Sequence, residues 1–172
     1  MNGTKTKTWT LAFLAVFVFA IPISLSAMLN IPIHKTLSLI VSTFVLEYLA
    51  VPVGIGLGLS PGFVLIVVTS VALSVVLLLL TIFEIIGDKS KRVSNFLSKS
   101  PAKAHNSKLI QKYGIYGLVP GVIILGFYVC PAVAWVLGWR KDYATILIIL
   151  GFVFISTIIM FTTIGGLELI LK

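Results

Sequence analysis

Five apolar segments, each long enough to cross a lipid bilayer, constrain this chain more than any other feature. They cover residues 9–33, 36–59, 62–86, 113–137 and 143–171. A segment of about 18 or more apolar residues spans a hydrocarbon core as a helix. In lipid every backbone N–H and C=O needs an internal partner, which leaves helices or a closed barrel. The runs are continuous rather than alternating, so the sequence predicts an all-α, polytopic membrane protein with one transmembrane domain over residues 1–172.

The composition excludes an ordinary soluble domain. Only 10% of the residues are charged and 59% are hydrophobic, with a mean hydropathy of +1.15, whereas about a quarter of the residues in soluble domains are charged. The first apolar run also resembles the start of a secretory signal peptide. It is longer than the apolar stretch of about 7–15 residues that such peptides carry. We therefore expect it to stay as a first helix.

The net charge of +8 is concentrated in one polar segment, residues 87–112. This segment carries one acid, Asp88, and seven basic residues: Lys89, Lys91, Arg92, Lys99, Lys103, Lys108 and Lys112. Short loops rich in Lys and Arg stay on the cytoplasmic side of a membrane. The charge therefore predicts a cytoplasmic loop of a multi-pass protein of the cell (plasma) membrane, and not a nucleic-acid partner.

Two topologies fit the chain, and they differ in the second and fourth segments. If both segments span, the basic loop and the positive-inside rule put Lys35 and Lys172 inside. If both are re-entrant, Lys35 and Lys172 move outside, while Lys5, Lys7 and residues 140–141 come inside. The second arrangement places more basic residues inside. A bundle of five spanning helices, with the second and fourth kinked, stays open.

Prolines and glycines distinguish these two segments from the other three. Because proline lacks a backbone donor and glycine weakens a helix, we expect breaks at membrane depth around Pro52 and Pro120. Residues 51–54 and 119–121 share the dipeptide Val-Pro, which suggests an inverted repeat. Transporters with such broken helices bind substrate between their two halves. The predicted substrate and proton pathway comprises Glu47, Pro52, Gly54, Gly58, Tyr113, Gly114, Pro120, Gly121, Gly126 and Pro131.

Glu47 is the acidic residue in the middle of an apolar run, and it is the main candidate for function. A charge at the bilayer centre costs roughly 2.5–3.5 kcal/mol, so such residues usually face a cavity and mark an ion or substrate path. Burial favours the neutral acid, which could take up and release a proton during transport. A purely structural role, in which the acid bonds backbone groups freed near Pro52, is the alternative.

The remaining chemistry of the sequence is sparse. Cys130 is the single cysteine, and His34 and His105 are isolated from other metal-ligand residues. Phosphate-loop, dinucleotide-binding and nucleophile-elbow motifs are absent from the sequence. We expect no cofactor, no metal and no enzymatic activity. Glu84 and Glu168 lie near segment ends, where a carboxylate reaches the membrane interface.

At these residues the chain resembles the putative small multidrug export proteins, a prokaryotic membrane family distantly related to the DedA-like group. The first matching feature is Glu47 shortly before Pro52 and Gly54. The second is the Tyr-Gly opening of residues 112–118, which continues through Gly126 to residues 134–138. Family members carry an Arg soon after the Glu, which this chain lacks. The resemblance implies a small transporter-like fold with paired re-entrant segments.

The sequence therefore predicts a small membrane exporter, with proton coupling through Glu47. Its substrate would be a small amphipathic molecule or a lipid, and a homodimer stays open. A membrane scaffold that binds a partner through the basic loop is the alternative, and it would tolerate replacement of Glu47 by glutamine.

Overall fold

The structure is a computed structural model that describes residues 16, 18–89 and 114–170. Within these ranges all regular elements are helical. A short helix, Val18–Met28, precedes the larger elements. These are α2 (Ile33–Leu46), the 3₁₀ turn η1 (Glu47–Leu49), α3 (Ala50–Gly56), α4 (Pro61–Lys89), the 3₁₀ turn η2 (Gly114–Gly117), α7 (Leu118–Val136) and α8 (Lys141–Ile170). The predicted all-α, polytopic fold is confirmed, and the second to fifth predicted apolar segments match these helices. The start of the first predicted segment and most of the predicted basic loop, residues 87–112, lie outside the described residues.

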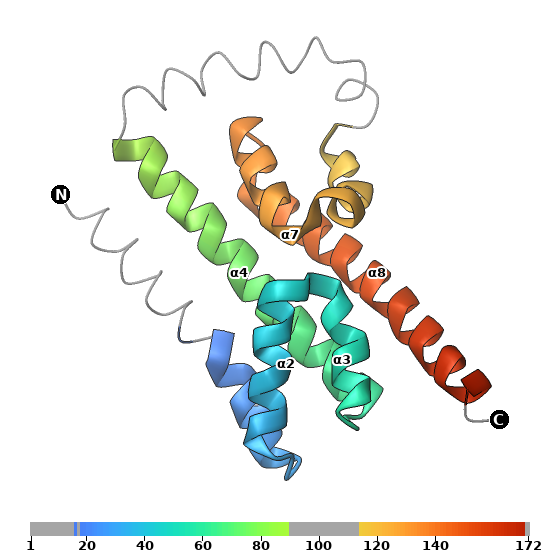
Figure 1. Ribbon diagram of the computed structural model, residues 1–172. Coiled ribbons are helices and arrows are strands. Elements are labelled where there is room, and N and C mark those ends of the chain that lie inside the picture. Colours follow the sequence, from blue (N-terminus) through green and yellow to red (C-terminus); the bar gives the residue numbers. More distant parts are fainter. Residues whose placement is uncertain (1–15, 17, 90–113, 171–172) are drawn as a thin grey trace.

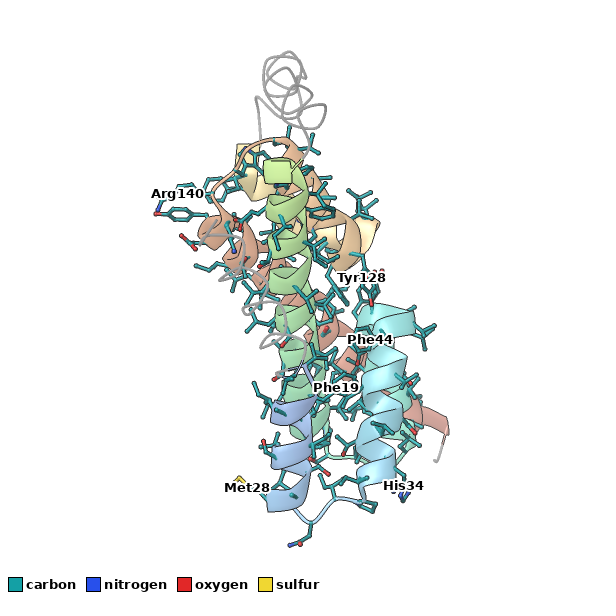
Figure 2. The ribbon with its side chains drawn as sticks, turned by 90° about the vertical axis from the view of Figure 1, so that its left-hand side faces the viewer. Phe19, Met28, His34, Phe44, Tyr128 and Arg140 are labelled. Carbon is teal, nitrogen blue, oxygen red and sulfur yellow. The ribbon has the colours of Figure 1, made fainter. Side chains whose placement is uncertain are left out.

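Two long helices, α4 with 29 residues and α8 with 30, slope side by side through the middle of the molecule in Figure 1 and cross in the view of Figure 2. At 1.5 Å per residue each is long enough to cross a bilayer, even when tilted. One face of α4 is fully buried and is lined by Val64, Val67, Val68 and Val71. This β-branched face forms the centre of the apolar core, against which the shorter helices pack.

The second apolar segment folds back on itself as the first hairpin, residues 33–56. The chain reverses at Glu47, whose backbone has φ 54° and ψ −124°, after its N–H has bonded the carbonyl of Thr43. Helices α2 and α3 then run side by side (Figure 1). The ammonium of Lys35 at the start of α2 donates to the carbonyl of Leu57 after α3, at 2.7 Å. Both ends of the hairpin therefore lie at the same end of the molecule.

The fourth apolar segment forms the second hairpin, residues 114–136. Here the chain reverses at Gly126, which has φ 75° and ψ 173° inside α7. The two halves of α7 lie beside each other (Figure 1). Gly114 before the hairpin and Trp139 after it line one cavity. The second hairpin points toward the first, and their tips meet near the middle of the molecule.

The predicted positions of the breaks, at Pro52 and Pro120, are wrong. Each proline is the third residue of a helix, α3 or α7. In the first turn of a helix the backbone N–H has no intrahelical partner, so proline fits there without breaking the helix. The reversals occur instead at Glu47 and Gly126, where the backbone turns to positive φ.

The two hairpins have the same order of elements and are followed by the same turn, so they form a structural repeat. The turn alone is not distinctive, because Asn30 after the helix Val18–Met28 also has positive φ and the same backbone bonds. Gly58 and Gly138, 80 residues apart, both have positive φ and precede a long helix by three residues. The same N–H to C=O hydrogen bonds surround each glycine. In the first repeat they run from Leu57 to Val53, from Gly58 to Ile55 and from Leu59 to Gly54; in the second they run from Leu137 to Val133, from Gly138 to Trp135 and from Trp139 to Ala134. The repeats enter from opposite ends of the molecule (Figure 1).

This register corrects the correspondence expected from the sequence. Pro52 corresponds to Ala132 and not to Pro120. The two Val-Pro pairs are therefore not equivalent positions, because the register is set by Gly58 and Gly138 and by the starts of α4 and α8, which are 80 residues apart.

Candidate functional site

The tips of the two hairpins are joined through Glu47. Its Oε2 accepts a hydrogen bond from the backbone N–H of Phe127, at 3.2 Å. Glu47 ends α2, and Phe127 begins the second half of α7 directly after the reversal at Gly126. The first N–H groups of a helix lack partners and carry its positive dipole end. The carboxylate of the first hairpin thus provides a hydrogen-bond acceptor for a backbone N–H at the start of a helix in the second hairpin.

Gly126 makes room for this contact. A Cβ placed on Gly126 would overlap both carboxylate oxygens of Glu47 and lie 2.7 Å from its Cδ. The φ of +75° also belongs to a region that glycine enters freely and other residues do not. Glycine is therefore required here for two independent reasons, the backbone conformation and the approach of the carboxylate.

Glu47 itself occupies a backbone conformation that favours glycine. A non-glycine residue at φ 54° and ψ −124° carries strain of about 1–3 kcal/mol. Strain of this kind persists where the surroundings hold it, and it gathers at functional sites. The chain therefore holds a carboxyl group at the tip at a cost in backbone energy.

Two tyrosines join the hairpins by reciprocal hydrogen bonds. The hydroxyl of Tyr48 donates to the carbonyl of Ile123 at 3.2 Å, and the hydroxyl of Tyr128 donates to the carbonyl of Phe44 at 2.7 Å. Figure 2 shows Tyr128 next to Phe44 at the upper end of α2. Each tyrosine follows its own reversal and reaches the helix that precedes the other reversal. The two bonds have the same pattern in the two repeats.

Aromatic packing shields one side of the site. The ring of Phe127 is fully buried, and its centroid lies 5.1 Å from that of Phe152 on α8 in an edge-to-face arrangement. The first half of α7 crosses α8 closely, because a Cβ on Gly151 would lie 2.7 Å from the carbonyl oxygen of Val119. The second hairpin is therefore held firmly against α8.

Two cavities open beside the joined tips. A cavity of about 340 Å³ is lined by Glu47, Tyr48 and Gly126 together with apolar side chains. A larger cavity of about 610 Å³ lies within the second hairpin and is lined almost wholly by apolar groups, including Pro120, Gly121 and Cys130. The site thus combines one carboxyl group with a spacious apolar compartment.

The predicted site residues lie in several different parts of the molecule. Glu47 and Gly126 meet at the tips, while Gly114, Pro120 and Gly121 line the larger cavity. Pro131 is buried within α7. The remaining ones lie elsewhere: Pro52 is part of α3, Gly54 faces Val64 and Leu39 so closely that an added Cβ would lie within 3.0 Å of both, and Gly58 forms the turn before α4. Tyr113 lies outside the described residues.

Sequence reasoning missed Tyr48, Phe127 and Tyr128. Their contacts join residues at least 75 positions apart, so no local pattern contains them. A signal was nevertheless available, since a tyrosine follows the reversal in both repeats. It could be read only after the register of the repeat was known.

Apart from Glu47, the ion pair and the cation–aromatic contact found in the described residues lie away from the tips. Lys141 and Glu84 form an ion pair of 3.4 Å, and the Arg140 guanidinium lies 5.0 Å from the centre of the Tyr143 ring. Figure 2 shows Arg140 at the end of the molecule opposite Met28 and His34. No group of three or more His, Cys, Asp and Glu residues within the described ranges could hold a metal ion.

The comparisons with known proteins bear on this site directly. A family model described as "Putative small multi-drug export protein" matches residues 47–159, which is more than half of the chain. The match begins at Glu47 and contains both hairpin tips and the contact between them. No curated protein and no solved structure matches the chain. The family's description is that of a transporter rather than an enzyme, and the chain belongs to this family of small multi-drug export proteins.

Proposed function

We propose that this protein is a small exporter of the cell membrane, in which the two hairpins re-enter the bilayer from opposite faces and Glu47 couples transport to proton movement. The family's description supports export. The folding back of both hairpins supports re-entry. The contact between the Glu47 carboxylate and the Phe127 N–H is the observation that carries the proposal.

Protonation of Glu47 would change the contact between the two repeats. The ionised carboxylate accepts a charge-assisted hydrogen bond from Phe127 N–H, which is about twice as strong as a neutral one. The neutral acid is a poorer acceptor, so a bound proton weakens the bond that joins the tips. Transporters built from inverted repeats expose a site alternately by moving one repeat against the other. Proton uptake at Glu47 would favour this movement.

Transport assays on the purified full chain in liposomes test the proposal. With an imposed pH gradient, we expect gradient-dependent movement of at least one probe from a set of cationic, anionic and neutral fluorescent amphipaths. Glu47→Gln keeps a carbonyl oxygen that can accept the Phe127 N–H but cannot carry a proton, so it should abolish this movement. Glu84→Gln, which removes a carboxylate paired with Lys141 far from the tips, is the matched control and should transport normally.

Two results would overturn this proposal. One is gradient-dependent transport that survives Glu47→Gln unchanged. The other is the absence of movement for every probe by the unaltered protein, which would favour the scaffold alternative.

Re-entry can be tested separately with single cysteines in a Cys130→Ala background. If the first hairpin re-enters, Lys35→Cys and Ser60→Cys lie on the same face of the membrane and both react with an impermeant reagent on intact cells. Gly87→Cys and Asp142→Cys should then react only after permeabilisation. In a bundle of five spanning helices, Lys35 and Ser60 would lie on opposite faces, and this result would contradict re-entry.

A further inference from the structure

The two cavities beside the hairpin tips are neighbours that share part of their walls, and together they are called the compartment here. Ile124 and Leu125 line both the cavity that contains Glu47 and the larger apolar cavity of the second hairpin. Glu47 belongs to the lining of the smaller cavity, and Gly121, Cys130 and Trp139 belong to the lining of the larger one. Ligand sites of this volume usually combine apolar walls with a few polar groups that fix orientation.

The charge at this compartment is negative and unbalanced within the described residues. Glu47 forms no ion pair there, since the salt bridge found in these ranges joins Lys141 to Glu84. Lys35 is bonded to Leu57 O at the base of the first hairpin. A carboxylate in surroundings of low polarity attracts a cation strongly, because the Coulomb interaction grows as the dielectric constant falls.

Tyr48 adds a second feature that favours a cation. Tyr48 lines the same cavity as Glu47. The face of an aromatic ring attracts cations by about 0.5–2 kcal/mol, depending on desolvation. An anion would meet repulsion from Glu47, and a neutral molecule would gain nothing from either group.

We propose that this compartment binds monovalent lipophilic cations, with the positive centre beside Glu47 and Tyr48 and the apolar body in the cavity of the second hairpin. This inference rests on the proposed function and narrows its substrate to one class. It also implies that a proton and the cation compete for the same carboxylate, which is a direct means of coupling their movements.

Tetraphenylphosphonium is a suitable probe, because it carries a fixed positive charge inside an apolar shell. Tetraphenylborate has nearly the same size and shape with the opposite charge, so it is the matched control ligand. We expect saturable binding of radiolabelled tetraphenylphosphonium to the full chain in nanodiscs of zwitterionic lipid. Unlabelled tetraphenylborate should compete at least tenfold more weakly than unlabelled tetraphenylphosphonium.

Variants separate the two parts of the compartment. Glu47→Gln should weaken binding of the cation at least tenfold, whereas Glu47→Asp, which keeps the charge, should weaken it only a few-fold. Gly121→Leu should also weaken binding at least tenfold by filling the larger cavity, since the side chain would project toward Cys130. Glu84→Gln should bind as the unaltered protein does. Retained helical circular dichroism and gel-filtration volume show that a variant is folded.

Unchanged binding in Glu47→Gln, or equal competition by tetraphenylborate, would overturn the inference. These outcomes are distinct from failure of the proposed function. Gradient-driven transport of only neutral or anionic probes would support the export function and contradict the cation site. Binding of the cation at Glu47, without transport of any probe, would support the cation site and contradict the export function.

Discussion

The two hairpin tips share a backbone path and differ in chemistry. Both reverse at a residue with positive φ, both continue into a helix, and both send a tyrosine to the opposite hairpin. At the point of reversal the first tip has Glu47 and the second has Gly126. The second tip is relaxed and open, and the first is strained and carries the carboxyl group that fills the opening. Only one copy of the repeat thus places a carboxyl group at its tip.

The largest effect on stability is expected when the second tip loses its glycine. Gly126→Ala should lower the free energy of unfolding by about 3 kcal/mol or more, because the methyl group collides with Glu47 and φ is unfavourable. Gly138→Ala is the control: its φ is +68° but no atom lies within 4 Å of the added methyl group, so about 1 kcal/mol is expected. Thermal unfolding in detergent measures both. Equal losses would contradict the collision with Glu47.

The next effect comes from making the first hairpin pack like the second. Gly54 contacts Val64, and the corresponding residues of the second repeat are Ala134 and Ala144. Gly54→Ala puts a methyl group 2.7 Å from Val64 Cγ2, which should cost about 1–3 kcal/mol.

Two further variants sharpen this prediction. Adding Val64→Ala to Gly54→Ala makes room for the methyl group, so the double variant should be more stable than the sum of the single losses predicts. Gly56→Ala has no atom within 4 Å of the new methyl group and should be neutral or stabilising. Strict additivity of the two single losses would show that Gly54 and Val64 do not pack as described.

Removing the tyrosine hydroxyls should have a smaller effect that differs between the two tips. Tyr128→Phe loses a bond of 2.7 Å and should cost about 1 kcal/mol, while Tyr48→Phe loses a longer bond of 3.2 Å and should cost about 0.5 kcal/mol. Tyr116→Phe, at a residue that is 73% exposed, should change nothing and serves as the control. Thermal unfolding in detergent again provides the measurement. A larger loss for Tyr48 would reverse the assigned order of the two bonds.

The smallest change in stability is expected when the first tip is made like the second. Glu47→Gly relieves the backbone strain and loses the bond to Phe127, so the unfolding free energy should change by less than about 1 kcal/mol. Proton-coupled transport in liposomes should nevertheless disappear. Asn30→Gly also replaces a residue with positive φ, at 51°, and should keep full transport. Full transport by Glu47→Gly would mean that the carboxyl group is structural.

The helices and the main candidate residue, Glu47, could be predicted from the sequence. A long apolar run indicates directly that a helix lies in lipid. The bounds predicted from these runs therefore agree with those of α4 and α8 to within a few residues. Glu47 was found because an acid in an apolar run is rare. The positions of the reversals were not found, because proline is read as a breaker although it fits the first turn of a helix. A homodimer stays a prediction.

The contacts between the tips could not be predicted from local patterns. Whether a glutamate adopts positive φ depends on what holds it there, and that partner lies 80 residues away. The different roles of the glycines in the predicted pathway could not be told apart from local patterns either. Gly54 lies in close packing, whereas Gly58 forms a turn and Gly121 borders a cavity.

The sequence separation of Glu47 and Phe127 also affects how the protein is made. Ribosomes add about 5–20 residues per second, so the first hairpin is synthesised roughly 4–16 s before the N–H that its carboxyl group will bond. During that interval Glu47 must be inserted into lipid or held by the insertion machinery without its final partner. The carboxyl group therefore gains its lasting hydrogen-bond partner only after the second hairpin has been made.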